Sequence, residues 1–149
     1  MKKILGLALV VCTSVGLLSC SGSSKKDTET IITESEVIEG IHTAKNSLDY
    51  KGTYIGVLPC ADCDSINVTI ELGDSNYTKT DVYNKNGKTT NAEVKGTYAW
   101  EADGNNIILN GVTDAPNKYF VGENTLTQRD MSGNEITGDL ASMYTLKKK

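Results

Sequence analysis

A chain of 149 residues is long enough for one ordinary domain with appendages. It carries 15 Lys and Arg residues against 19 Asp and Glu residues, a formal net charge of −4. Because an acidic chain offers no broad positive surface, we expect no nucleic acid as a partner and no charge-driven binding to anionic lipid headgroups.

The amino terminus is typical of an export signal. Lys2 and Lys3 precede an apolar run over residues 4–18, which is shorter than the roughly 20 residues that a membrane span requires. The run ends in Leu17-Leu18-Ser19-Cys20, which resembles the lipobox of bacterial lipoproteins, where the cysteine is acylated. The sequence therefore predicts a signal peptide over residues 1–19 and a membrane anchor made by the acyl chains on Cys20, each buried CH2 group contributing about 0.8 kcal/mol.

The positions of the four cysteines predict which of them remain as free thiols in the exported protein. Cys12 would leave with the signal peptide and Cys20 would carry lipid, so that only Cys60 and Cys63 remain as thiols. Both would lie in an exported, oxidising compartment, where two nearby cysteines tend to form a disulfide.

Residues 20–49 are predicted to form a flexible polar tether. The segment begins with small polar residues that cannot offset the entropy cost of ordering. A coil of this length has a reach of roughly 30 Å. A weak helix over residues 34–45 is the alternative for part of it, because three apolar residues there have helical spacing. His42, the only histidine, lies in this segment and is expected to be solvated rather than a ligand.

From residue 50 onward the pattern predicts strands. Residues 66–72 alternate apolar and polar side chains with a period of two, and residues 94–100 repeat the pattern, with Trp100 expected in the core. Shorter runs predict further strands at 52–57, 77–83, 107–109, 118–121, 126–130 and 142–146. About eight short strands separated by Gly- and Asn-containing turns favour an all-β domain over residues 50–149, as a closed antiparallel barrel rather than a sandwich.

A Cys-Ala-Asp-Cys motif lies between the first two predicted strands. Pro59 cannot donate to a strand ladder, so the segment is expected to be a loop. Cys60 and Cys63 can close a small disulfide or hold a metal ion. Structural zinc is not expected, since it needs about four ligands, whereas soft Cu(I) accepts fewer thiolates. Met131 and Met143 could add thioether ligands to a copper site, although methionines in small barrels usually pack.

A redox-active pair is the third interpretation of this motif. Dithiol enzymes place CxxC at a helix amino terminus, which lowers the thiol pKa. Here the motif leads into a predicted strand, and Asp62 and Asp64 disfavour a thiolate by like charge. We therefore expect a structural disulfide and no enzymatic activity. Copper binding, a thiol oxidoreductase and a barrel that binds a small apolar ligand stay open as alternatives.

The motif and the strands around it resemble a known family. The stretch Tyr54-Ile55-Gly56-Val57-Leu58-Pro59-Cys60-Ala61-Asp62-Cys63 is similar to the amino-terminal domain of NlpE copper-resistance lipoproteins, and the resemblance covers about residues 50–147. Later matching elements are Tyr77, Tyr83, Gly96-Thr97-Tyr98-Ala99-Trp100, Ile107-Ile108-Leu109, Tyr119, Leu126, Gly133 and Tyr144-Thr145-Leu146.

The resemblance implies a lipocalin-like β-barrel of about six to eight strands, anchored in the outer membrane. It also implies a role in sensing envelope stress or surface contact, an envelope signalling partner, and a link to copper tolerance. Ser21 after the lipidated cysteine favours the outer membrane by the same analogy. Longer members carry a second domain with a further CxxC, whereas only Lys147-Lys148-Lys149 follow the last predicted strand here. Signalling that depends on the second domain is therefore not expected of this sequence.

Overall fold

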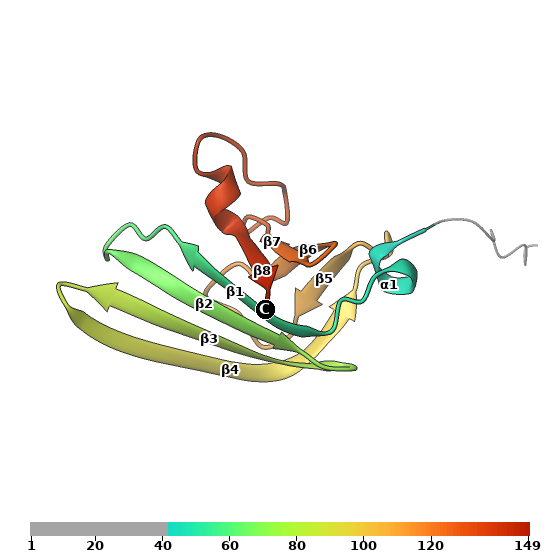
Figure 1. Ribbon diagram of the computed structural model, residues 1–149, viewed down its shortest axis with the longest axis horizontal. Helices are drawn as coiled ribbons and strands as arrows, with labels where there is room; N and C mark the ends of the chain where they lie inside the picture. The colour runs from blue at the N-terminus through green and yellow to red at the C-terminus, as the bar shows by residue number, and fades with distance from the viewer. Residues whose placement is uncertain (1–41) are drawn as a thin grey trace, which may run out of the picture. The chain divides into compact units, whose positions relative to one another are not determined.

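The computed structural model describes residues 42–149, so the predicted signal peptide, the lipidation site Cys20 and residues 20–41 of the predicted tether lie outside the described residues. Residues 42–149 form an eight-stranded antiparallel barrel in which spatial order follows chain order and β1 pairs with β8 to close the ring (Figure 1). The prediction of a small all-β barrel of about six to eight strands is confirmed. The strands are β1 (Gly52–Leu58), β2 (Ser65–Leu72), β3 (Asn76–Lys85), β4 (Lys88–Trp100), β5 (Asn106–Leu109), β6 (Lys118–Gly122), β7 (Thr125–Gln128) and β8 (Thr145–Lys148).

Alternation along the strands builds the core. On β2, Val68, Ile70 and Leu72 are buried, as their period of two predicts. The largest side chains with almost no exposed surface are three tyrosines and six aliphatic residues. They are Tyr54, Tyr77, Tyr119, Ile70, Ile107, Leu109, Leu126, Leu146 and Val121. These side chains fill the interior of the barrel with packed rings and branched chains.

Trp100 lies at the margin of this core rather than inside it, so its predicted place as core filler is wrong. It is half-buried and meets Tyr50 edge-on, with ring centroids 4.9 Å apart. The reason is positional, because Trp100 is the last residue of β4 and therefore stands where the strand leaves the barrel.

The strands differ in length, and β4 pairs with β5 only from Tyr98 to Trp100, so the tip of the β3–β4 hairpin has no strand on that side; we call this the open end of the barrel. β3 and β4 pair over ten residues from Asn76↔Thr97 to Lys85↔Lys88, whereas β5, β7 and β8 have four residues each. In Figure 1 the β3–β4 hairpin extends well beyond the short strands. Asn86 and Gly87 form its turn with φ of 50° and 73°, the left-handed conformations that an Asn-Gly hairpin turn requires.

The last part of the predicted tether belongs to the domain. Residues Ala44–Ser47 form a helical turn, α1, and Ala44 is buried. The Ala44 N–H donates to Asn105 Oδ1 at 2.8 Å, and the Lys45 N–H donates to the Gly104 carbonyl at 3.0 Å. Residues 42–49 of the predicted tether thus include a turn that its own sequence supports weakly and that these tertiary contacts stabilise. Of the weak helix predicted over residues 34–45, the described part contains only the start of α1.

The carboxy-terminal segment differs from the predicted strand over residues 142–146. A 3-10 turn, η1 (Ala141–Tyr144), precedes β8 and is closed by backbone hydrogen bonds such as Met143 N–H to the Leu140 carbonyl at 2.9 Å. Leu146, the buried residue of β8, fixes the register of the strand that follows. No helix within residues 42–149 is both long and apolar enough to cross a membrane.

Candidate functional site

The candidate site lies at the open end of the barrel, where the β1–β2 connection faces the tip of the β3–β4 hairpin. This connection, residues 59–64, is called the cysteine loop. Cys60 and Cys63 are joined by a disulfide, with their Cα atoms 5.2 Å apart. The disulfide closes a small ring within the cysteine loop. Copper binding and redox activity stay predictions.

Asp64 anchors the cysteine loop to the hairpin. Its backbone N–H donates to the Asn84 carbonyl at 2.7 Å, and its carboxylate accepts the Asn86 N–H at 2.9 Å. A third bond runs from Asn84 Nδ2 to Ser65 Oγ at 3.2 Å. Asp64 thus has a role that the sequence did not reveal, since it holds two turns of the chain together.

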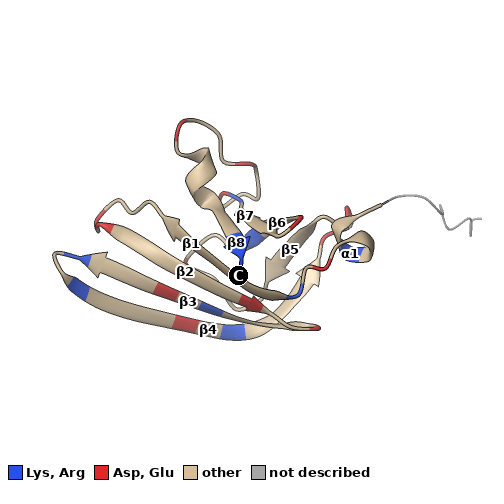
Figure 2. Ribbon diagram, in the orientation of Figure 1, with Lys and Arg blue, Asp and Glu red and all other residues tan. Residues whose placement is uncertain are grey.

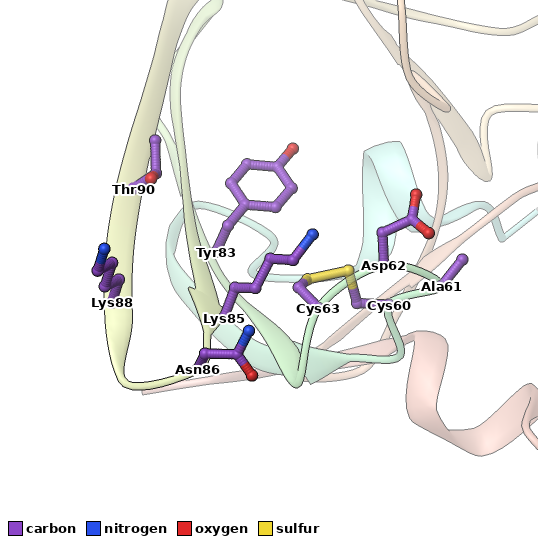
Figure 3. A pocket seen from close by; sticks show the side chains of 9 residues that line it. All are labelled: Cys60, Ala61, Asp62, Cys63, Tyr83, Lys85, Asn86, Lys88 and Thr90. Atoms are coloured by element: carbon purple, nitrogen blue, oxygen red, sulfur yellow. A yellow bond between two sulfur atoms is a disulfide. The ribbon is translucent and has the colours of Figure 1, made fainter.

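Between the loop and the hairpin is a cavity of about 590 Å³ (Figure 3). Its lining comes from both sides: Cys60, Ala61, Asp62, Cys63, Tyr83, Lys85, Asn86, Lys88 and Thr90. Figure 3 shows the Lys85 side chain extending toward the disulfide. We call this space the loop cavity.

Two lysines face the loop cavity from opposite strands. Lys85 on β3 and Lys88 on β4 are direct cross-strand partners, and both are exposed. Neither forms an ion pair within residues 42–149. Figure 2 shows blue segments, the colour of Lys and Arg, on β3 and β4 beside the turn of their hairpin. Below them Tyr83 is half-buried, and burial followed by the charge of Asp81 raises the pKa of its phenol.

A buried ion pair lies in the interior, which the sequence analysis missed. Lys79 and Asp81 on β3 form a salt bridge with side-chain exposures of only 7% and 13%, and Asp81 Oδ1 has no partner among the described residues. Burial raises the pKa of the nearby Tyr119, with a further contribution from Asp81, and its hydroxyl donates to Gln128 Oε1 at 3.4 Å. The signal was present in the alternation of β3, which places both charges on the face of Tyr77.

Neither the single histidine, which was expected to be solvated, nor the two methionines considered as copper ligands lie at the cysteine loop. His42 is exposed beside α1, with Nδ1 3.4 Å from Ser47 Oγ. Met131 and Met143 are 67% and 41% exposed and do not line the loop cavity, so the expectation that they pack in the barrel is wrong. Over residues 42–149, no three His, Cys, Asp or Glu side chains are grouped so that they could hold one metal ion.

The family described as NlpE N-terminal domain matches residues 54–139, from β1 through the cysteine loop to the segment before η1. The chain belongs to the NlpE N-terminal domain family. This places the disulfide, its anchor Asp64 and the loop cavity inside the matched part of the NlpE domain.

Two solved structures are similar to this NlpE domain. A crystal structure from Shewanella oneidensis, described as a candidate lipoprotein, is 41% identical with a TM-score of 0.65, covering 72% of this chain and 95% of that one. The Cpx pathway activator NlpE from Escherichia coli is 26% identical with a TM-score of 0.48, covering 59% of this chain and 46% of that one. The chain therefore spans less than half the length of the Escherichia coli protein. No curated protein sequence matches the chain.

Proposed function

We propose that this protein is a lipid-anchored, non-enzymatic component of the outer membrane that acts in envelope-stress or surface sensing, or in copper tolerance, through its cysteine loop. The observation that carries the proposal is the position of the disulfide-closed loop within the family match, at the open end of the barrel. The lipobox at Cys20 and the similarity to a candidate lipoprotein support the lipid anchor.

The geometry of the loop supports a binding surface for an envelope signalling protein. Ala61 and Asp62 at its tip are exposed, while the disulfide and the Asp64 bonds hold the loop in one shape. A surface that is rigid before binding loses less conformational entropy on association. The loop is therefore suited to direct protein contact rather than to catalysis.

The copper role depends on reduction of the disulfide. A reductant that supplies two electrons, with two protons from water, would convert the disulfide to the thiols of Cys60 and Cys63, which would lose those protons on binding Cu(I). Two thiolates suit this soft ion, and the described residues supply no grouped third ligand, so the donor set fits Cu(I) and not structural zinc. Copper binding would then be confined to the reduced protein.

The two alternatives have less support. A thiol oxidoreductase needs a reactive thiol of low pKa, whereas the cysteine loop is followed directly by β2 and not by a helix. A binder of an apolar ligand inside the barrel needs an open interior, whereas Tyr54, Tyr77 and Tyr119 fill this one.

Complementation of a deletion strain tests the proposal. Deletion is expected to change an envelope-stress reporter or copper tolerance, and the wild-type gene to restore it. Cys20→Ser should leave uncleaved precursor that does not fractionate with the outer membrane, and Cys60→Ser/Cys63→Ser should stay in the membrane without restoring function. A Cys20→Ser protein that still fractionates with the membrane, or a cysteine variant with full function, would refute the corresponding part.

A further inference from the structure

The loop cavity combines two kinds of surface. The disulfide, Ala61 and the half-buried ring of Tyr83 give it a largely apolar lining. Lys85 and Lys88, both exposed, also line it, and the Lys85 side chain extends toward the disulfide (Figure 3). Its volume of about 590 Å³ falls within the range of roughly 300–1,000 Å³ that is usual for small-molecule sites.

The lysine pair places two like charges on neighbouring strands at the cavity. Like charges placed directly opposite each other on neighbouring strands repel, and Lys85↔Lys88 is such a pair. Asp62 lines the same cavity without forming an ion pair with either lysine. Asp64 is occupied by the Asn86 N–H. An anionic group beside the Lys85 ammonium, which extends toward the disulfide in Figure 3, would offset this like charge and accept a charge-assisted hydrogen bond.

The lining next to the lysines suits an uncharged, apolar group. A tyrosine phenol is neutral at physiological pH, and burial raises the pKa of Tyr83 further. The half-buried ring of Tyr83 lines the cavity. The disulfide beside it is also uncharged. Removing an apolar chain from water onto this surface is favourable by roughly 25 cal/mol per Å² of buried area.

We infer that the loop cavity binds an anionic amphiphile, with a carboxylate or phosphate head on the side lined by Lys85 and Lys88 and an apolar body against Tyr83 and the disulfide. This site goes beyond the proposed function, since it needs neither copper nor a protein partner. A purely apolar ligand would leave the lysine repulsion in place, and an inorganic anion alone would leave the apolar lining in water.

Calorimetric titration tests the inference on the mature chain from residue 20 with Cys20→Ser, so that no acyl chain of its own competes. The probes are decanoate and decyl phosphate below their micelle concentrations, with decanol, decyltrimethylammonium and inorganic phosphate as controls. Saturable one-to-one binding of at least one anionic probe is expected, at least about tenfold tighter than decanol. The tighter of the two anionic probes identifies the head that the lysines accept.

Matched variants locate the site. Lys85→Gln/Lys88→Gln should weaken binding by about tenfold, because two exposed charge contacts are lost. Lys95→Gln/Lys147→Gln removes the same charge from exposed positions outside the loop cavity and should bind as the wild type does. Thermal unfolding of each variant confirms that it is folded. Absence of saturable binding by both anionic probes, equal affinity for decanol, or equal affinity in the Lys85/Lys88 variant would overturn the inference. These assays involve no copper, stress reporter or partner, so their failure leaves the proposed function standing.

Discussion

The interior of the barrel and its cysteine-loop end obtain their shape in different ways. The interior is held by packing, with tyrosines and aliphatic residues at almost no exposure around one buried ion pair. The cysteine-loop end is held by a disulfide and a few hydrogen bonds to Asp64, around a cavity whose edge is exposed. The two regions are therefore held in different ways, and substitutions in them should have different consequences for stability.

The largest loss of stability is expected from breaking the buried ion pair. Lys79→Met should lower the free energy of unfolding by about 3–5 kcal/mol, because it leaves the Asp81 carboxylate buried without its partner. Denaturant unfolding measures the effect. Lys95→Met is the matched control, since Lys95 pairs with Glu93 on the exposed surface, and it should cost less than about 1 kcal/mol. Equal effects would show that the Lys79–Asp81 pair is not buried in solution.

A leucine deletion compares the core with the surface directly. Leu126→Ala should cost about 2–5 kcal/mol because Leu126 has no exposed surface and its loss leaves a cavity. Leu140→Ala makes the same chemical change at a residue that is 53% exposed and should stay within about 0.5 kcal/mol of the wild type. If both variants unfold at the same denaturant concentration, the assignment of the core is wrong.

Trp100 should give an intermediate result. Trp100→Ala is expected to cost about 1–2 kcal/mol, because the side chain is half-buried and loses its edge-on contact with Tyr50. Trp100→Phe should recover most of this loss, since a ring remains to meet Tyr50. A cost above about 3 kcal/mol would place Trp100 inside the core, as its sequence pattern predicted.

Local pattern predicted the fold well and the contacts between distant segments poorly. Period-two alternation located β2, and Pro59 marked the cysteine loop, since both signals lie within a few neighbouring residues. By contrast, α1 depends on acceptors at Gly104 and Asn105, which are far along the chain. The 3-10 turn η1 was missed for a different reason, because its backbone hydrogen bonds are local but the pattern of residues 142–146 favoured a strand.

The candidate site was predicted only in part for the same reason. Cys60 and Cys63 stand out because their spacing is local and their chemistry is specific. The lysine pair requires the β3–β4 register, and the anchoring role of Asp64 requires the meeting of two separate turns. Neither can be read from residue spacing alone.

The central claim is that the cysteine loop carries function while the barrel carries stability, and one paired measurement on Cys60→Ser/Cys63→Ser tests it. The disulfide closes a very short ring, so its loss should lower the free energy of unfolding by at most about 2 kcal/mol and leave the barrel folded. In the deletion strain the same variant should fail to restore the stress reporter or copper tolerance. A folded variant with full function, or a variant whose barrel does not fold, would contradict the account.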